Sequence, residues 1–264
     1  MQSNSNILQV NNLSKFFGGL AAVSNCSLKI KKGSITGIIG PNGSGKSTLF
    51  NLIAGNLISS KGTVLFNDED ITNTPSYELF SKGVLRTFQI AHEFTNLTVL
   101  ENLMMVPGNQ SGENLVNALF KPGIVRNEEL KVKEKASEVI DFLNLTHLSN
   151  ELAGNLSGGQ KKLLELGRTM MVDAKLVLLD EVGAGVNRTL LKEIGNAILR
   201  LNKEKGYTFC MIEHDMEFIS RLCNPVIVMA EGAVLFEGTP DEVKKNEQVI
   251  ESYLGRGSKL KGKD

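Results

Sequence analysis

Residues 38–50 read IIGPNGSGKSTLF, and this stretch decides the fold. From Gly40 to Ser47 the spacing is that of a phosphate-binding loop: a glycine, four residues, then Gly-Lys-Ser. The apolar run SITGII before the loop predicts a buried strand, and STLFNLIAG after it predicts a helix that ends at Gly55. Strand, glycine loop and helix in this order predict a nucleotide site.

The residue types in the loop suit a triphosphate. Glycines let backbone amides approach phosphate oxygens, and the new helix directs its unpaired N–H groups and positive dipole end at the anion. We expect Lys46 to neutralise the β and γ phosphates and the Ser47 hydroxyl to bind Mg²⁺. The residues of this loop predicted to bind the nucleotide are Gly40, Pro41, Asn42, Gly43, Ser44, Gly45, Lys46, Ser47 and Thr48.

A second apolar run, residues 176–179, ends in Asp180 and Glu181. Consecutive apolar residues are typical of a parallel strand that is buried on both faces. Ligands bind beyond the carboxyl ends of such strands. We therefore expect Asp180 to orient Mg²⁺ or its waters, and Glu181 to act as general base towards an attacking water.

The order of the predicted elements indicates an α/β fold interrupted by a helical insertion. Strand-like runs cover 7–13, 26–30, 35–40 and 62–66, and they return at 175–180, 207–214, 225–230 and 233–238. Helical spacing dominates between the two groups. We predict one domain: an α/β core with an N-terminal β-subdomain (1–86 and 172–238), a helical subdomain (87–171), and C-terminal helices with a basic tail (239–264).

Three helices are predicted from periodicity and caps. The first covers residues 127–145, where the apolar stripe is Leu130, Ala136, Val139, Ile140 and Leu143. The preceding residues, 107–127, are predicted to be irregular with one short helix. Another helix follows Asn187 as cap and stops at Gly206. A third starts at Thr239 with a capping box to Glu242.

Composition excludes several classes of protein. The chain has 264 residues, 41% hydrophobic and 22% charged, with a formal net charge of zero, which gives no general attraction to nucleic acid. Its three cysteines lie in apolar runs and are expected to be buried free thiols. We expect no secretory signal and no segment that spans a membrane.

The stretch LSGGQ, residues 156–160, resembles the signature of the ABC transporter ATPases. In that family the signature contacts the γ-phosphate of an ATP held by a partner subunit, which implies nucleotide contacts for Ser157, Gly158, Gly159 and Gln160. Ser157 is also a good helix cap, so anion binding at this helix start has a physical basis.

The other family elements occur in order along the chain. Gln89, in RTFQ, matches the glutamine that contacts Mg²⁺ and the water, and His214, in IEHD, matches the histidine that contacts the γ-phosphate. Phe17 matches the aromatic residue that stacks on adenine, while Phe16 could belong to the core. The resemblance thus implies a P-loop NTPase fold with a RecA-like core, and catalytic roles for Glu181, His214 and Gln89.

Further stretches, including GVLRTFQ, EGTPDEV and IESYLG, resemble the ATPase subunits of branched-chain amino acid importers, a group that also serves urea and short amides. This resemblance implies a second ATPase subunit, a paralogue or an identical copy, together with permease subunits and, indirectly, a substrate-binding protein. It places the chain peripherally on the cytoplasmic face of the inner membrane. The apolar stretch that follows Gln89 either offers a groove to a permease helix, with Phe94 and Thr95 as the candidates, or packs as core of the helical insertion.

Two departures from the family pattern stand beside the proposed catalytic glutamate. Val182 occupies the position of a usual proline, which leaves the loop less constrained. Asn187 stands where many ABC ATPases have aspartate.

The alternatives to an importer ATPase are a soluble ABC ATPase without a transport role, a regulatory nucleotide-binding module and an exporter. The single cassette disfavours the first, and Glu181 with His214 disfavours the second.

Overall fold

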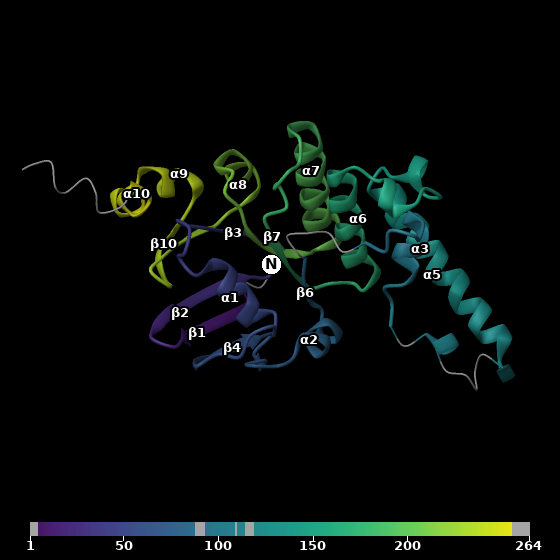
Figure 1. The fold of residues 1–264 in the computed structure, drawn as a ribbon, viewed down its shortest axis with the longest axis horizontal. Coiled ribbons are helices and arrows are strands. Elements are labelled where there is room, and N and C mark those ends of the chain that lie inside the picture. The colour runs from purple at the N-terminus through teal and green to yellow at the C-terminus, as the bar shows by residue number, and fades with distance from the viewer. Residues whose placement is uncertain (1–4, 88–92, 109, 114–118, 255–264) are drawn as a thin grey trace, which may run out of the picture. The chain divides into compact units, whose positions relative to one another are not determined.

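The computed structural model describes residues 5–87, 93–108, 110–113 and 119–254. The chain forms two compact units (Figure 1). The first comprises Met1–Arg86, Lys175–Gly183 and Leu199–Asp264, and the second Thr87–Ala174 and Ala184–Ile198. Residues 172–174 and 184–198 thus belong to the second unit, whereas the sequence analysis placed them with the core.

An antiparallel sheet begins the first unit. Its strand order is β2-β1-β4-β5, with β1 Asn6–Phe17, β2 Leu20–Lys31, β4 Lys61–Phe66 and β5 Glu69–Asp70. One face of this sheet belongs to the same buried cluster as the first helix, α1 (Lys46–Ile53). The predicted N-terminal β-layer and the loop helix therefore share one core.

The second sheet of this unit has six strands. Its order is β10-β9-β3-β8-β7-β6, with β3 Ile35–Ile39, β6 Val84–Arg86, β7 Leu176–Asp180, β8 Thr208–Ile212, β9 Val226–Ala230 and β10 Ala233–Gly238. All neighbours pair in parallel except β10 with β9. The carboxyl ends of β3, β7 and β8 therefore lie at one edge, which is where ligands bind in parallel α/β sheets.

Short helices complete the first unit: α2 Ser76–Lys82, α8 Met216–Leu222, α9 Pro240–Lys245 and α10 Glu247–Leu254. The capping box predicted at Thr239 and Glu242 is confirmed, since each side chain bonds the backbone N–H of the other residue. The helix after Asn187 is α7, Arg188–Lys205, and Asn187 accepts the N–H of Leu190 as expected.

Helices dominate the second unit: α3 Val99–Met104, α5 Pro122–Phe142 and α6 Gly158–Met171 (Figure 1). Short 3₁₀ turns lie at Ser111–Glu113, Thr146–Leu148 and Ala153–Asn155. Helix α6 packs closely through Gly167, where an added Cβ would lie 2.8 Å from Leu143 Cδ1. The helical character predicted for this region is confirmed.

Two local expectations were wrong. Leu130 is 50% exposed rather than part of a buried stripe, and α5 buries only Ala136, Val139 and Ile140, all in its later half. Phe16 is 43% exposed and does not belong to the core.

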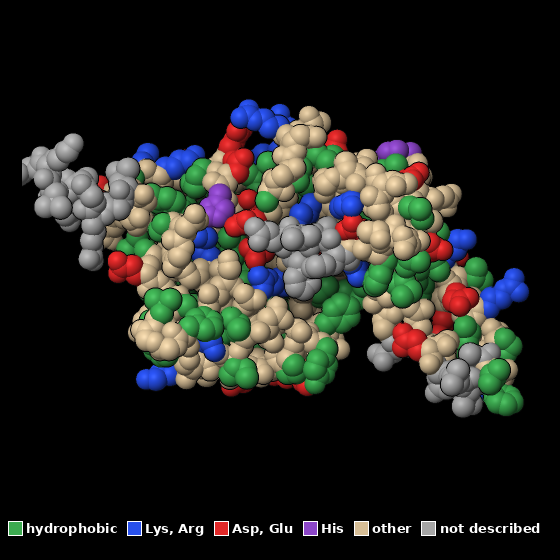
Figure 2. All heavy atoms as spheres, viewed as in Figure 1, with side chains coloured by type: hydrophobic (Ala, Val, Ile, Leu, Met, Phe, Trp, Pro, Cys, Tyr) green, Lys and Arg blue, Asp and Glu red, His purple; other side chains and the backbone are tan. Residues whose placement is uncertain are grey.

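The distribution of surface charge and the burial of the cysteines agree with what the composition predicts. In Figure 2, acidic and basic side chains are interspersed over the visible face, as expected for a chain with no net charge. The three cysteines are free and buried, as predicted. Within the described residues, no helix has both the length and the apolar character needed to cross a bilayer.

Candidate functional site

The phosphate-binding loop joins β3 to α1 in a conformation that requires glycine at two positions. Gly40 has φ +150°, and a Cβ there would lie 2.1 Å from the Met229 carbonyl oxygen. Gly45 has φ +96°, and its Cβ would lie 2.4 Å from the carbonyl oxygen of Ala22. These glycines let the loop pack against neighbouring backbone, whereas Gly43, at φ +78°, faces open space.

Lys46 is held inside this loop. Its Nζ donates to the carbonyl oxygens of Gly40 at 2.8 Å and Pro41 at 3.0 Å, and its side chain is almost fully buried. Burial lowers the pKa of Lys46, while the charges of Glu181 and Asp180 act in the opposite direction. The ammonium is thus preorganised within the loop, near two carboxylates.

Helix α1 starts at Lys46, and its first turn places the Ser47 side chain at the surface. No side chain caps this helix, so its first N–H groups receive no such partner. An exposed hydroxyl beside a helix N-terminus is a suitable place for an anion and its counter-cation. Thr48, the next residue, is half-buried.

Asp180 ends β7, and its carboxylate is almost buried. Arg86, the last residue of β6, donates from Nη2 to Asp180 Oδ2 at 2.6 Å, and from Nη1 to Asn51 Oδ1 on α1. The sequence analysis did not single out Arg86 or Asn51. Strand order brings Arg86 to Asp180, because β6 lies next to β7 in the sheet.

Glu181 and His214 follow neighbouring parallel strands, β7 and β8, so they meet although they are far apart in sequence. His214 Nε2 lies 3.1 Å from Glu181 Oε1. The Glu181 backbone has φ +49° and donates its N–H to the Ile212 carbonyl. A left-handed conformation at a non-glycine residue is uncommon and here directs the carboxylate towards the histidine.

Glu213 is a buried carboxyl that the sequence analysis missed. Its Oε1 accepts the N–H of Gly183, two residues after the proposed base, at 2.8 Å. Burial raises the pKa of Glu213, and its hydrogen bonds to the backbone oppose that shift. A signal was present in the sequence, since Glu213 directly continues the apolar strand 208–212.

The LSGGQ signature forms the start of α6. Ser157 caps the helix and forms a capping box with Gln160, whose Oε1 accepts the Ser157 N–H at 2.8 Å. Ser157 and Gly158 are exposed, while Gly159 is buried against Leu190 of α7. The exposed part of the signature is therefore Ser157 and Gly158, and Gly159 has a packing role.

The two aromatic residues predicted to contact partners, Phe17 and Phe94, are both partly exposed. Phe17 is 48% exposed at the end of β1, with Lys15 Nζ 5.1 Å from its ring centroid. Gln89 lies outside the described residues. Phe94 is 48% exposed, and the Arg168 guanidinium carbon lies 5.7 Å from its ring centroid. Neither aromatic ring is buried, so each remains open to a partner.

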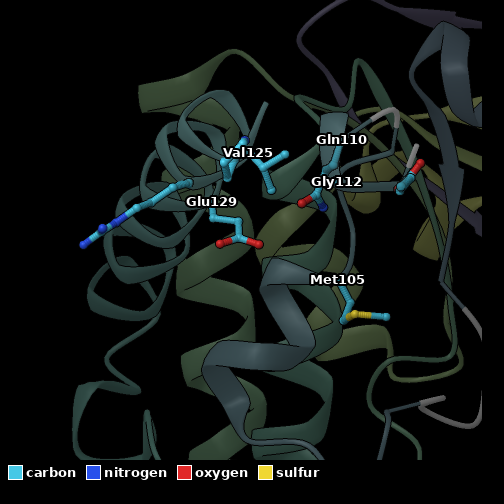
Figure 3. Close-up of a pocket in the computed structure, with 8 residues that line it drawn as sticks. Met105, Gln110, Gly112, Val125 and Glu129 are labelled. Atoms are coloured by element: carbon cyan, nitrogen blue, oxygen red, sulfur yellow. The ribbon is translucent and has the colours of Figure 1, made fainter. Parts of the chain in front are cut away.

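A hollow of about 780 Å³ lies in the second unit, between the end of α3 and the start of α5 (Figure 3). Met105, Gln110 and Glu129 are among its lining residues. None of the residues predicted to bind the nucleotide lines it.

The glycine loop after β3, the acidic pair at the end of β7 and the histidine after β8 define a P-loop nucleotide-binding protein. The family model described as "ABC transporter" matches residues 23–184. A second model, "Branched-chain amino acid ATP-binding cassette transporter", matches residues 233–259. The chain belongs to the ABC transporter ATP-binding family, in its branched-chain amino acid group, and is an ATPase of the transport class.

Similar proteins extend over nearly the whole chain. It is 43% identical over 249 residues to the probable branched-chain amino acid transport ATP-binding protein LivG of Archaeoglobus fulgidus, covering 94% of this chain and 95% of that protein. Identity to the protein of the same description from Methanocaldococcus jannaschii is 42% over 259 residues, covering 97% and 100%. The family expected from the motifs is confirmed.

Solved structures agree on the fold. A nucleotide-free ATP-binding cassette from an ABC transporter superposes with a TM-score of 0.82 at 41% identity, covering 96% of this chain and 100% of that one. An ATP-binding cassette described as dimeric, in a post-hydrolysis state with ADP and phosphate, superposes at 0.71 with 25% identity, covering 88% and 98%. The predicted ABC ATPase fold is therefore confirmed.

Proposed function

We propose that this chain hydrolyses ATP to power an importer of branched-chain amino acids. The relatives described above are named for branched-chain amino acid transport, and the C-terminal family model carries the same description. The observation that carries the catalytic part is the 3.1 Å contact between Glu181 and His214 at the sheet edge that also carries the phosphate loop.

In this proposal the loop from Gly40 to Thr48 binds the phosphates. Lys46 contributes positive charge, and the helix α1 N-terminus contributes N–H donors. Mg²⁺ fits the available donors, because Ser47 offers a hydroxyl and Asp180 a carboxylate, and Mg²⁺ prefers oxygen ligands while keeping several waters. Gln89 would complete this set, and Phe17 would stack on the adenine.

Glu181 acts as the general base. It accepts a proton from the attacking water, whose oxygen bonds to the γ-phosphorus while the bond to the β–γ bridging oxygen breaks, which yields ADP and phosphate. His214 holds the carboxylate in place and contacts the γ-phosphate. Their contact lies beyond the ends of β7 and β8, where a nucleotide on the loop after β3 can reach both side chains.

Two such chains, identical or paralogous, form a head-to-tail sandwich in which Ser157 and Gly158 of one subunit close on the ATP of the other. Both residues are exposed at the start of α6, and a relative at 25% identity is described as dimeric. The γ-phosphate stabilises the closed form and its loss loosens it, which is a ligand-biased two-state element. Permease subunits would dock near Phe94 and hold the complex at the cytoplasmic face of the membrane.

The test is Glu181→Gln in the assembled transporter. We expect the wild-type transporter to drive leucine uptake into vesicles when ATP is supplied. In the Glu181→Gln variant, ATP turnover should fall by about 10²-fold or more, while ATP still binds. Glu193→Gln, an exposed position on α7, is the matched control and should keep full turnover. Normal ATP turnover in Glu181→Gln would refute the role of Glu181 as general base. If the wild-type transporter took up urea instead of leucine, the proposed substrate would be wrong.

A further inference from the structure

Arg86 lies at the centre of a hydrogen-bonded connection between two elements of the nucleotide site. Its guanidinium donates to Asp180 at the end of β7 and, through the other terminal nitrogen, to Asn51 on α1. Asn51 in turn donates from Nδ2 to the Ser47 carbonyl oxygen at 2.8 Å. One continuous relay therefore links Ser47, Asn51, Arg86 and Asp180.

The relay joins the residues that the proposed function assigns to Mg²⁺. Ser47 and Asp180 stand at its two ends, and Arg86 precedes Gln89 by three positions in the sequence. Arg86 is also the last residue of its unit before the chain enters the helical unit. It is thus the point where β6 fixes both the carboxylate and the first turn of α1.

The ion pair in this relay is shielded from solvent. The side chain of Arg86 is 12% exposed and that of Asp180 is 8% exposed. Salt and water therefore weaken the pair much less than they weaken a surface pair. The planar guanidinium has donors at fixed angles, so it can hold Asp180 and Asn51 at once, whereas a lysine ammonium supplies charge without that fork.

We propose that Arg86 is a positioning residue of the magnesium site. By holding the Asp180 carboxylate and, through Asn51, the backbone of Ser47, it sets the separation of two oxygen donors that must meet one Mg²⁺. Mg²⁺ demands near-ideal octahedral geometry at about 2.0–2.1 Å, so small displacements of either donor weaken binding. The proposal rests on the Mg²⁺ role assigned to Ser47 and Asp180 above.

The test measures how much Mg²⁺ strengthens binding of an ATP analogue that resists hydrolysis. Calorimetric titrations with Mg²⁺ and with EDTA give this ratio for the wild type, Arg86→Lys and Asn51→Ala. We expect the ratio to fall about 10-fold in Arg86→Lys, the scale of lost support for a metal ligand, while affinity in EDTA stays within about 3-fold. Arg200→Lys, in an exposed pair with Glu204, is the control and should leave the ratio unchanged.

Three further results test the proposal. Because Arg86 and Asn51 act through one relay, the double variant should lose less than the product of the two single effects. An unchanged Mg²⁺ ratio in Arg86→Lys, with a lowered melting temperature, would refute the proposal and leave Arg86 a structural role. A wild-type protein whose analogue affinity ignores Mg²⁺ would refute the Mg²⁺ site of the proposed function and this inference with it.

Discussion

Adjacent glycines in the LSGGQ signature should respond in opposite ways to the same substitution. At Gly159 an added Cβ would lie 1.9 Å from Leu190 Cδ2, 2.4 Å from its Cγ and 3.1 Å from its Cβ. Real Cβ atoms do not approach so closely, so Leu190 or the first turn of α7 must move. At Gly158, one residue earlier, a Cβ meets nothing within 4 Å.

The magnitude follows from these distances. Forcing a methyl group into a packed contact costs about 1–3 kcal/mol. Alanine also gains up to about 1 kcal/mol over glycine in a helix, and this gain applies at both positions. We therefore expect Gly158→Ala to be neutral or slightly stabilising, and Gly159→Ala to be about 1–3 kcal/mol less stable than Gly158→Ala.

Thermal unfolding of the full chain, followed by circular dichroism, measures this difference. For a chain of this size each kcal/mol shifts the melting temperature by about 2–4 °C. Shortening Leu190 should relieve the clash, so Gly159→Ala with Leu190→Ala should lose less than the sum of the two single changes. Equal melting temperatures for Gly158→Ala and Gly159→Ala would show that Leu190 does not pack on Gly159 in solution.

Two further outcomes are expected from buried charged groups. Lys46→Ala should lower ATP affinity by about 10²-fold or more, the scale for removing one partner of a buried charge pair, and an unchanged affinity in a calorimetric titration would contradict this role. Glu213→Gln keeps an acceptor for Gly183 but removes a carboxyl whose pKa burial raises above its ordinary 4.5. The folded wild type therefore retains a proton that the unfolded chain releases above about pH 4.5, so its stability declines as the pH rises towards the folded-state pKa. The Glu213→Gln variant should not show this decline. If the difference in stability between the variant and the wild type did not change from about pH 4 to 8, the raised pKa of Glu213 would be refuted.

The sequence alone predicted those features whose cause is local. The glycine loop, the apolar run before Asp180 and the caps at Ser157, Asn187 and Thr239 each depend on residues a few positions apart. Backbone sterics and helix-end hydrogen bonding act over that range, and the structure reproduces these elements. The buried face of helix α5 was predicted less well. Leu130 has the helical spacing of the apolar residues, but within the described part of the chain no neighbouring element covers it.

Only the tertiary structure decided which of these local elements meet. Strand order in the parallel sheet places His214 against Glu181, and it places Arg86 of β6 against Asp180 of β7. Likewise, Gly159 has a packing role because α7 brings Leu190 onto it. Such contacts join residues that are far apart in the chain, and no local spacing encodes them. They arise because burying several apolar strands side by side aligns the carboxyl ends of those strands at one edge.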